Sequence, residues 1–221
     1  MRFTSSRAIC FDLDGTLTDP KLGITRAIRH ALAALDQPVA DDDDLTWCIG
    51  PPLLSNFETL LGERQQAAAA LAQYRERFSA IGLYENAVYP GIREALASLT
   101  SAGHRLFVAT GQPWVYAERI IEHFALASHF DAVFGAELDG TRSDKTNLLG
   151  WVLDRASLDA ATTTMIGDRS HDIVGGRSNR MATVGVLYGY GTTEELTNAD
   201  ADRLCETPAD LLQTLNDCRA E

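Results

Sequence analysis

The chain has few cysteines, and none of them form a Cys-x-x-Cys pair. The four are Cys10, Cys48, Cys205 and Cys218, and Cys10 lies inside an apolar run. A zinc site or a redox pair built from cysteines would show close, regular spacing. We therefore expect reduced and mostly buried thiols, as in a protein of the cytosol.

The sequence also lacks a long hydrophobic run. A membrane-spanning helix needs about 20 consecutive apolar residues, and no window of this chain approaches that length. The apolar run in the N-terminal segment MRFTSSRAICFD is too short for the hydrophobic region of a signal peptide, and acidic residues follow at once. We expect a cytoplasmic protein with no membrane partner.

Positive charge is scarce. Lys and Arg number 19 against 31 Asp and Glu, the formal net charge is −12, and no Lys/Arg-rich patch stands out. Such a surface repels nucleic acids and anionic membranes, so neither is an expected partner. A small anionic substrate would need a locally positive site, made by a metal ion, a lysine or a helix N-terminus. Nothing in the sequence indicates an oligomeric state.

What the chain does contain is an alternation of short apolar runs with helical patterns. Its 221 residues, 45% of them hydrophobic, suffice for one α/β core with an insertion or for two small domains. The expected strands are Ala8–Leu13, Arg105–Thr110, Asp131–Phe134, Thr163–Gly167 and Thr183–Leu187. The expected helices between them are Pro90–Ser101, Pro113–Phe124, Lys145–Arg155 and Ser170–Asn179. This alternation predicts a Rossmann-like parallel sheet with helices on both faces.

One long stretch interrupts the alternation. Residues 19–85 contain no convincing strand, and apolar residues recur there at helical spacing over 24–35 and 67–81. We interpret the stretch as a small all-helical domain inserted after the first strand, with residues 1–18 and 86–221 forming the α/β core. The acidic run Asp41–Asp44 is interpreted as a solvated loop and helix cap rather than a metal site.

Two acidic clusters directly follow expected strands, at the end of an α/β sheet where ligands bind. In DLDGT, Asp12 and Asp14 are two residues apart, so on a strand their carboxylates point to the same side. In GDRSHD, Asp168 is a suitable Mg²⁺ ligand together with Asp12. Asp172 lies one helical turn later and either orients a metal-bound water or is a first-turn helix acid. His171 is expected to be solvated or packed, because Mg²⁺ prefers oxygen.

Two weaker signals complete a phosphate site. Thr110 and Gly111 follow the strand RLFVA, and Pro113 then opens a helix, so a hydroxyl and backbone N–H groups would lie at a helix N-terminus. Lys145 precedes the helical pattern TNLLGWVL. Taken alone, the first is a common turn and the second a surface lysine. Phosphoryl transfer needs a nucleophile, a cation and positive donors, and this chain supplies each at a strand end.

In their order, DLDGT, VATG, SDK and GDRSHD resemble the four motifs of phosphatases of the haloacid dehalogenase superfamily, over essentially the whole chain. The helical insertion resembles the cap of the phosphoglycolate phosphatase-like branch of that superfamily. The segments IGPPL, YPGI, DGTRSDK and YGYG are similar to segments of the same branch. The first and fourth motifs are specific, and the other two are weak outside this context.

The resemblance implies a Mg²⁺-dependent phosphatase. Asp12 would be the nucleophile that forms an aspartyl-phosphate, and Asp14 would protonate the leaving oxygen and then deprotonate the attacking water. Mg²⁺ would be held by Asp12, the backbone carbonyl of Asp14, and Asp168. Thr110 and Lys145 would bind the phosphoryl group.

The substrate is less clearly indicated. Gly50, Pro51 and Pro52 would face the substrate from the cap, or else form a helix–helix turn without ligand contact. Gln112 stands where relatives often carry a lysine, which puts the contacts to the leaving group in doubt. The expected activity is hydrolysis of a small phosphorylated metabolite of the phosphoglycolate type, with a 5′-nucleotidase as the alternative. A phosphomutase and a non-catalytic binding protein are less favoured, and a dehalogenase has no need of Asp14.

Overall fold

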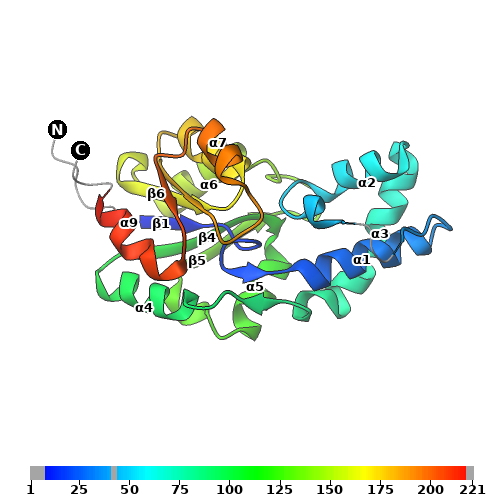
Figure 1. Cartoon of the computed structure of the whole chain (residues 1–221), viewed down its shortest axis with the longest axis horizontal. Coiled ribbons are helices and arrows are strands. Elements are labelled where there is room, and N and C mark those ends of the chain that lie inside the picture. The colour runs from blue at the N-terminus through cyan, green and yellow to red at the C-terminus, as the bar shows by residue number, and fades with distance from the viewer. Residues whose placement is uncertain (1–7, 41–43, 218–221) are drawn as a thin grey trace. The chain divides into compact units, whose positions relative to one another are not determined.

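The structure is a computed structural model that describes residues 8–40 and 44–217, and the chain divides into two compact units (Figure 1). The first unit, called the α/β unit below, contains the chain up to Thr18 and from Val88 onward. The second, the helical unit, is Asp19–Ala87. Two short strands, β2 (Thr18–Asp19) and β3 (Ala87–Val88), pair with each other where the chain passes between the units.

A six-stranded sheet forms the centre of the α/β unit as far as the structure describes it, and its paired strands run parallel. In order across the sheet the strands are β5 (Ala132–Ala136), β4 (Arg105–Pro113), β1 (Ala8–Phe11), β6 (Thr163–Gly167), β7 (Ala182–Val186) and β8 (Arg203–Cys205). Phe11 of β1 pairs with Val108 on one side and Ile166 on the other. Because the strand order reverses at β1, the carboxyl ends of β1, β4 and β6 lie where a ligand site is expected.

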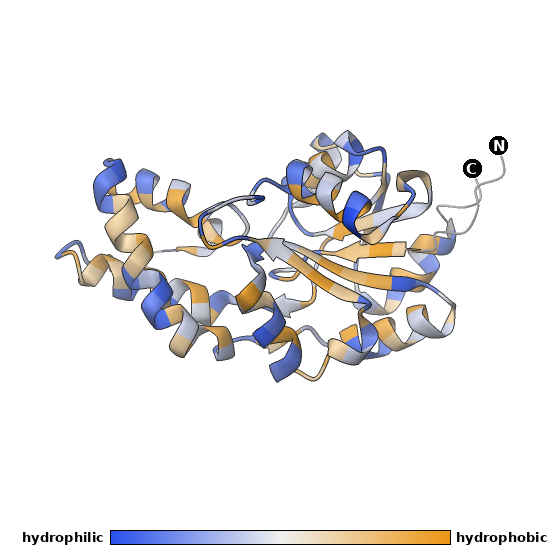
Figure 2. Cartoon of the chain, turned by 180° about the vertical axis from the view of Figure 1, so that it is seen from behind, coloured by the Kyte–Doolittle hydropathy of each residue, from blue (hydrophilic) through white to orange (hydrophobic). Residues whose placement is uncertain are grey.

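The strands are nearly continuous apolar runs because helices cover both faces of the sheet. Figure 1 shows α6 (Lys145–Ala156) and α7 (Ser170–Ser178) over one face, and α4 (Ile92–Ser101) and α5 (Trp114–His123) over the other. Hydrophobic colouring follows the strands in Figure 2. One cluster of buried side chains lies between the sheet and α6, and its members are Ala8, Cys10, Phe107, Ala109, Leu148, Leu149, Val152, Met165 and Met181.

The remaining elements of the α/β unit are short. They are η3 (Ala127–His129), η4 (Ala160–Thr162), α8 (Thr193–Asn198), η5 (Pro208–Asp210) and α9 (Leu211–Asp217). None of the helices within residues 8–40 and 44–217 is long and apolar enough to cross a membrane. The described cysteines Cys10, Cys48 and Cys205 are buried free thiols, and Cys218 lies outside the described residues. The expected α/β class with a parallel sheet is confirmed.

An aromatic cluster joins two helices of the helical unit. The elements of this unit are α1 (Lys21–Ala33), η1 (Thr46–Cys48), α2 (Leu53–Leu61), α3 (Arg64–Ala80) and η2 (Gly82–Tyr84). Tyr74 of α3 stacks on Phe78 at 5.1 Å between ring centroids and meets Phe57 of α2 edge-on at 6.2 Å. Ile81, at the end of the expected apolar stripe, is 53% exposed because α3 ends at Ala80.

Of the acidic run, Asp41–Asp43 lie outside the described residues. Asp44 is exposed, and its Oδ1 accepts hydrogen bonds from the backbone N–H of Thr46, at 2.8 Å, and from the Thr46 hydroxyl, at 2.6 Å. These contacts tie Asp44 to the first residue of η1, whose N-cap residue is Leu45 and makes no side-chain cap hydrogen bond.

Candidate active site

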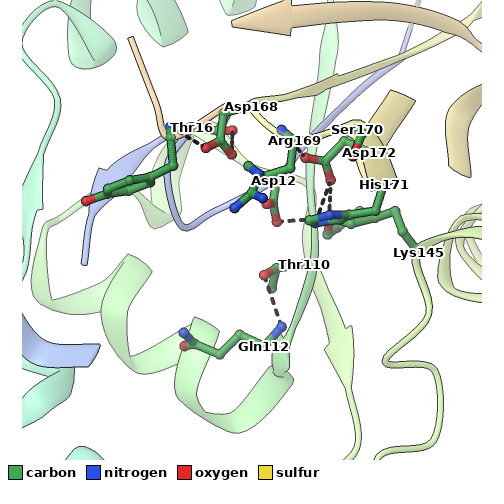
Figure 3. A network of polar contacts seen from close by, with 12 residues as sticks. Asp12, Thr16, Thr110, Gln112, Lys145, Asp168, Arg169, Ser170, His171 and Asp172 are labelled. Carbon is green, nitrogen blue, oxygen red and sulfur yellow. Dashed lines mark hydrogen bonds and ion pairs between the residues drawn. The ribbon is translucent and has the colours of Figure 1, made fainter. Parts of the chain in front are cut away.

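Three neighbouring strands bring the candidate residues to one end of the sheet (Figure 3). Asp12 directly follows β1, and its backbone N–H donates to the carbonyl of Ile166 at 2.9 Å, which continues the pairing with β6. Thr110 lies in β4, and Asp168 directly follows β6. Asp12, Thr110 and Asp168 are all buried. The strand register therefore sets the positions of three side chains that are far apart in the sequence.

Lys145, the first residue of α6, reaches Asp12 of this group with its side chain. Its Nζ donates to the carbonyl of Ala109 at 2.9 Å and forms ion pairs with Oδ1 of Asp12, at 2.9 Å, and Oδ1 of Asp172, at 2.7 Å. Three oxygens thus face the three N–H groups of the ammonium. Burial acts to lower the pKa of Lys145, but the two carboxylates outweigh it, and the pKa lies above its ordinary value. Lys145 is therefore a buried and permanently charged cation.

Asp172 lies in the first turn of α7 and holds Lys145 in place. Its second oxygen accepts the backbone N–H of Arg169 at 3.1 Å. Burial acts to raise the pKa of Asp172, but Lys145 and this N–H bring it below its ordinary value, so the carboxylate stays ionised. The ion pair with Lys145 is a contact that neither sequence interpretation of Asp172 includes.

Asp14 lies in the loop after β1 and contacts Gln112 of β4. The amide Nε2 of Gln112 donates to Oδ2 of Asp14 at 2.6 Å. Oδ1 of Asp14 and Oε1 of Gln112 are buried and have no hydrogen-bond partner within the part of the chain that the structure describes. Burial raises the pKa of Asp14 to about 8, the charge of Asp12 acts in the same direction, and the Gln112 hydrogen bond opposes both. The sequence marks Gln112 as a departure from the family but does not reveal this contact.

The loop between Asp12 and β2 is closed by its own backbone. The carbonyl of Leu13 accepts the N–H groups of Leu17, at 2.9 Å, and Thr18, at 3.0 Å. Gly15 has a φ of +87°, and a Cβ at this position would lie 2.2 Å from Oδ2 of Asp168. Only glycine suits this position, because the backbone is left-handed and a carboxylate fills the space of a side chain.

Asp168 is completely buried and is held by two neutral donors. The hydroxyl of Thr16 donates to Oδ1 at 3.3 Å, and the backbone N–H of Tyr190 donates to Oδ2 at 2.8 Å. Burial raises the pKa of Asp168 well above its ordinary value, and the charges of Asp172 and Asp12 add to the effect. The sequence motifs contain Thr16 and Tyr190, but their roles follow only from the contacts.

Thr110 and Gly111 lie within β4 rather than after it, and Pro113 is the N-cap residue of α5, close to the helix start that the sequence predicts. Both belong to β4, which continues to Pro113 through a shift in its pairing with β5 between Thr110 and Pro113. Helix α5 begins only at Trp114. The Thr110 hydroxyl accepts the backbone N–H of Gln112 at 3.2 Å. A strand irregularity therefore directly precedes the N-terminus of α5 in this segment.

Gly50, Pro51 and Pro52 belong to the helical unit. Gly50 has a φ of +106°, and Pro52 is the N-cap residue of α2. The buried side chain of Asn56 donates to the carbonyls of Cys48, at 2.8 Å, and Pro51, at 3.4 Å. The loop before α2 is thus fixed from within the helical unit.

Comparison with known proteins identifies the family. The family described as haloacid dehalogenase-like hydrolase matches residues 9–186. The chain belongs to the haloacid dehalogenase-like hydrolases. It is 47% identical over 208 residues to a protein of Pseudomonas aeruginosa named 5′-nucleotidase, with 94% of each chain covered. It is 40% identical to the tyrosine-protein kinase PtkA of Mycobacterium tuberculosis, over 86% of this chain and 65% of that relative.

A solved structure agrees with this assignment. The crystal structure of a predicted phosphatase from Clostridium acetobutylicum matches with a TM-score of 0.93 and 37% identity, covering 97% of this chain and 100% of that one. The resemblance to haloacid dehalogenase superfamily phosphatases is confirmed, and the protein is a phosphoric monoester hydrolase of this family.

This haloacid dehalogenase-like hydrolase has two groupings that could attract a cation. One ligand atom each of Asp12, His171 and Asp172 lies within 4.8 Å of the others. The Asp12 and Asp172 carboxylates, however, already share the ammonium of Lys145. Lys145 therefore offsets one of the two negative charges of that grouping, and Mg²⁺ prefers oxygen over imidazole.

The grouping expected from the sequence suits a divalent cation better. Asp12 and Asp168 are buried, and the charge of Asp12 adds to the burial that raises the pKa of Asp168. Within the described residues Asp168 forms no ion pair, and its donors are a hydroxyl and an N–H. Buried carboxylates without a compensating charge are costly. Hard oxygen atoms with an excess of negative charge fit Mg²⁺.

Proposed function

We propose that the protein is a Mg²⁺-dependent phosphatase that hydrolyses nucleoside 5′-monophosphates through a phosphoryl intermediate on Asp12. The observation that supports the chemistry best is the contact of Asp12 with Lys145 at the end of the central strand β1. Burial raises the pKa of Asp12 above its ordinary value, and the Lys145 ammonium 2.9 Å away opposes that shift and so favours the ionised form. An ionised carboxylate at this position is a nucleophile held in place.

The reaction has two steps. A carboxylate oxygen of Asp12 attacks phosphorus, the bond from phosphorus to the ester oxygen breaks, and Asp14 gives its proton to the departing oxygen. A water molecule then attacks the same phosphorus, Asp14 takes up the water proton, and the acyl-phosphate bond to Asp12 breaks to release phosphate. A pKa of about 8 keeps Asp14 mostly protonated at neutral pH, as the first step requires.

The remaining residues bind and neutralise the phosphoryl group. We assign Asp12, the backbone carbonyl of Asp14, and Asp168 to Mg²⁺, which when bound offsets the negative charge that crowds the site. Lys145 holds Asp12, and with Thr110 and Gly111 it would face the phosphoryl oxygens. Since the ammonium already faces three oxygens, binding phosphate through Lys145 requires that one of them be exchanged.

The substrate class is supported by similarity rather than by geometry. The relative named 5′-nucleotidase is 47% identical along 94% of both chains. Relatives named phosphoglycolate phosphatase, from Vibrio parahaemolyticus and Vibrio cholerae, are only 24% and 26% identical to this chain, so we place a phosphoglycolate-type substrate second. The relative named tyrosine-protein kinase is a longer protein, and we do not extend its activity to this chain. We propose that the helical unit, through the loop Gly50–Pro52, selects the leaving group.

A panel of phosphate esters tests the proposal. Purified protein with Mg²⁺ is assayed for phosphate release from nucleoside 5′-monophosphates, 2-phosphoglycolate and 4-nitrophenyl phosphate. We expect the highest kcat/KM for a nucleotide, loss of all activity with excess chelator, and recovery with Mg²⁺ but not Ca²⁺, whose longer and more numerous bonds suit the reaction poorly. A higher kcat/KM for 2-phosphoglycolate would replace the substrate assignment.

One variant tests the nucleophile. Asp12→Asn should fold normally and lose several orders of magnitude of turnover on every ester, because no covalent step remains. A folded Asp12→Asn protein that keeps more than about a tenth of wild-type activity would show that Asp12 is not the nucleophile.

A further inference from the structure

The proposed acid–base residue is held by a side chain from a neighbouring strand. Asp14 and Gln112 are 98 residues apart in the sequence, yet Nε2 of Gln112 lies 2.6 Å from Oδ2 of Asp14. Both residues belong to the α/β unit. The contact exists because β1 and β4 are paired and their ends lie side by side.

We propose that Gln112 is a positioning residue that fixes the Asp14 carboxyl group so that Oδ1 is the oxygen that exchanges the proton with the leaving group and with water. The inference rests on the proposed function, in which Asp14 is the acid and base. It identifies Gln112 as the residue that orients Asp14, and Oδ1 of Asp14 as the oxygen that carries the proton.

The hydrogen bond distinguishes the two oxygens of the carboxyl group. Oδ2 accepts the amide N–H of Gln112, whereas Oδ1 is buried and has no partner among the described residues. In a carboxylic acid the oxygen that accepts a strong N–H donor is the carbonyl oxygen, and the other carries the proton. The second torsion of an aspartate side chain is broad and nearly two-fold, so without an external contact neither oxygen has a fixed direction.

Gln112 can serve as a fixed reference because its own backbone is held. Its N–H donates to the hydroxyl of Thr110 at 3.2 Å, within the irregular end of β4. Its carbonyl lies where a Cβ on Gly135 would be 2.5 Å away, so the strand β5 packs directly against it. A side chain that starts from such a fixed point and ends in a hydrogen bond holds its partner to a small range of directions.

Loss of the Gln112 hydrogen bond should slow the reaction by an amount that depends on the leaving group. Gln112→Leu removes the amide and keeps a side chain of similar size. Gln112→Lys keeps a donor of similar reach. Gln213→Leu repeats the first change on an exposed residue of α9 and serves as the control. The readout is single-turnover release of the leaving group with enzyme in excess, which isolates formation of the Asp12 phosphoryl intermediate.

Two esters with different leaving groups then distinguish a loss of Asp14 orientation from a general loss of activity. From a nucleoside 5′-monophosphate the nucleoside leaves as an alkoxide that must be protonated, whereas from 4-nitrophenyl phosphate the leaving group is a stable phenolate. We expect Gln112→Leu to slow nucleotide cleavage by about 10²-fold, which is the order of the rate enhancement that a positioned general acid supplies. Cleavage of 4-nitrophenyl phosphate should slow by less than about tenfold. Gln112→Lys should restore most of the nucleotide rate, and Gln213→Leu should match the wild type on both esters.

The results distinguish a failure of the positioning role of Gln112 from a failure of the proposed function. Equal losses on both esters, or no loss on either, in a Gln112→Leu protein whose urea unfolding midpoint matches the wild type would overturn the positioning role alone. Failure of Gln112→Lys to recover the nucleotide rate would also count against it. A wild-type protein that cleaves neither ester, or an Asp12→Asn variant that cleaves both, would overturn the proposed function and this inference with it.

Discussion

Nζ of Lys145 lies 2.7 Å from Oδ1 of Asp172, slightly closer than the 2.9 Å that separates it from Oδ1 of Asp12. All three side chains are buried. Asp172 is itself held by the N–H of Arg169 at the start of α7. A chain of contacts therefore runs from the N-terminus of α7 through Asp172 and Lys145 to Asp12. Through it, a helix that carries no reacting atom fixes the orientation of the proposed nucleophile.

This relationship predicts the effect of Asp172→Asn. The variant leaves the Lys145 ammonium with one carboxylate instead of two in a buried site. Removal of one partner of a buried ion pair destabilises a protein by about 3–5 kcal/mol. We expect the free energy of unfolding in urea to fall by that order and turnover to fall as well, because Asp12 loses its fixed partner.

Asp154→Asn is the matched control, since it makes the same change on the exposed side of α6. It should leave both the unfolding free energy and turnover near the wild-type values. Asp172→Asn with wild-type stability and wild-type turnover would show that Asp12 does not depend on this chain of contacts.

Much of the fold is visible in the sequence, because buried parallel strands and their helices have distinct periodicities. The elements missed are those with weak patterns. Strand β8 (Arg203–Cys205) has three residues, and α2 (Leu53–Leu61) follows two prolines in a segment that reads as a loop. The end of β4 extends past Thr110 because its irregular pairing with β5 continues to Pro113, and no local sequence signal marks such a shift.

The candidate site, like the fold, is only partly predictable from the sequence. Asp12, Asp14, Asp168 and Lys145 are predictable, because charged residues that follow apolar strands gather at one end of a parallel sheet. The partners that hold them are not. The contact of Gln112 with Asp14 depends on the pairing of β1 with β4, and sequence spacing carries no information on that register.

A second prediction concerns the loop that covers Asp168. A Cβ on Gly189 would lie 2.3 Å from the carbonyl oxygen of Gly15 and 2.4 Å from Cβ of Asp168, so Gly189→Ala must displace one of them. The neighbouring Tyr190 N–H, which donates to Asp168, would move too. Changes next to a metal ligand typically weaken metal binding by about 10–100-fold, and we expect the Mg²⁺ concentration for half-maximal activity to rise by that order.

A binding readout makes this test independent of turnover. Mg²⁺ should raise the melting temperature of the wild type, and the same rise should need more Mg²⁺ in Gly189→Ala. Gly150→Ala serves as the control, because it lies in α6 and its added methyl would meet only the Asn179 side chain, at 3.1 Å. An unchanged Mg²⁺ requirement in a folded Gly189→Ala protein would separate this loop from the metal.

A third prediction concerns pH and the stability of the helical unit. The carboxylate of Glu85 pairs with Arg77 and Arg26, each at 2.8 Å, and the hydrogen bond from Arg77 is the largest influence that lowers its pKa from 4.5. A carboxyl group whose pKa is lower in the folded state stabilises the protein above its unfolded pKa. This stabilisation disappears as the pH falls through the folded pKa. Glu85→Gln should therefore cost stability at pH 7 but much less in strong acid.

The pairs are near the surface, so we expect the difference in unfolding free energy at pH 7 to be about 1 kcal/mol. Urea unfolding of the wild type and Glu85→Gln is measured at a series of pH values. The difference in unfolding free energy between them should become smaller below about pH 4.5. Glu76→Gln, an identical change at an exposed position of α3, should show no such pH dependence. A difference that stays constant down to strong acid would mean that the charge of Glu85 is not what stabilises the unit.

The last prediction concerns the loop Gly50–Pro52 and the selection of substrate. The residues assigned to the chemistry all belong to the α/β unit, whereas this loop belongs to the helical unit. Replacement of both Pro51 and Pro52 by Ala should therefore change the ranking of kcat/KM among phosphorylated metabolites. Hydrolysis of 4-nitrophenyl phosphate, an undemanding ester, should stay much closer to wild type.

The structure also supplies the competing explanation and the variant that separates the two. Pro52 caps α2, and the buried Asn56 holds the carbonyls of Cys48 and Pro51, so the prolines could serve only to shape the turn. Asn56→Ala removes that hold and should lower the melting temperature, since it leaves buried carbonyls without their donor. If the proline variant behaves like Asn56→Ala, with lower stability and an unchanged substrate ranking, the prolines only shape the turn. If the proline variant keeps its melting temperature while the ranking of kcat/KM among substrates changes, the loop selects the leaving group. A purely structural defect would reduce activity on all esters alike.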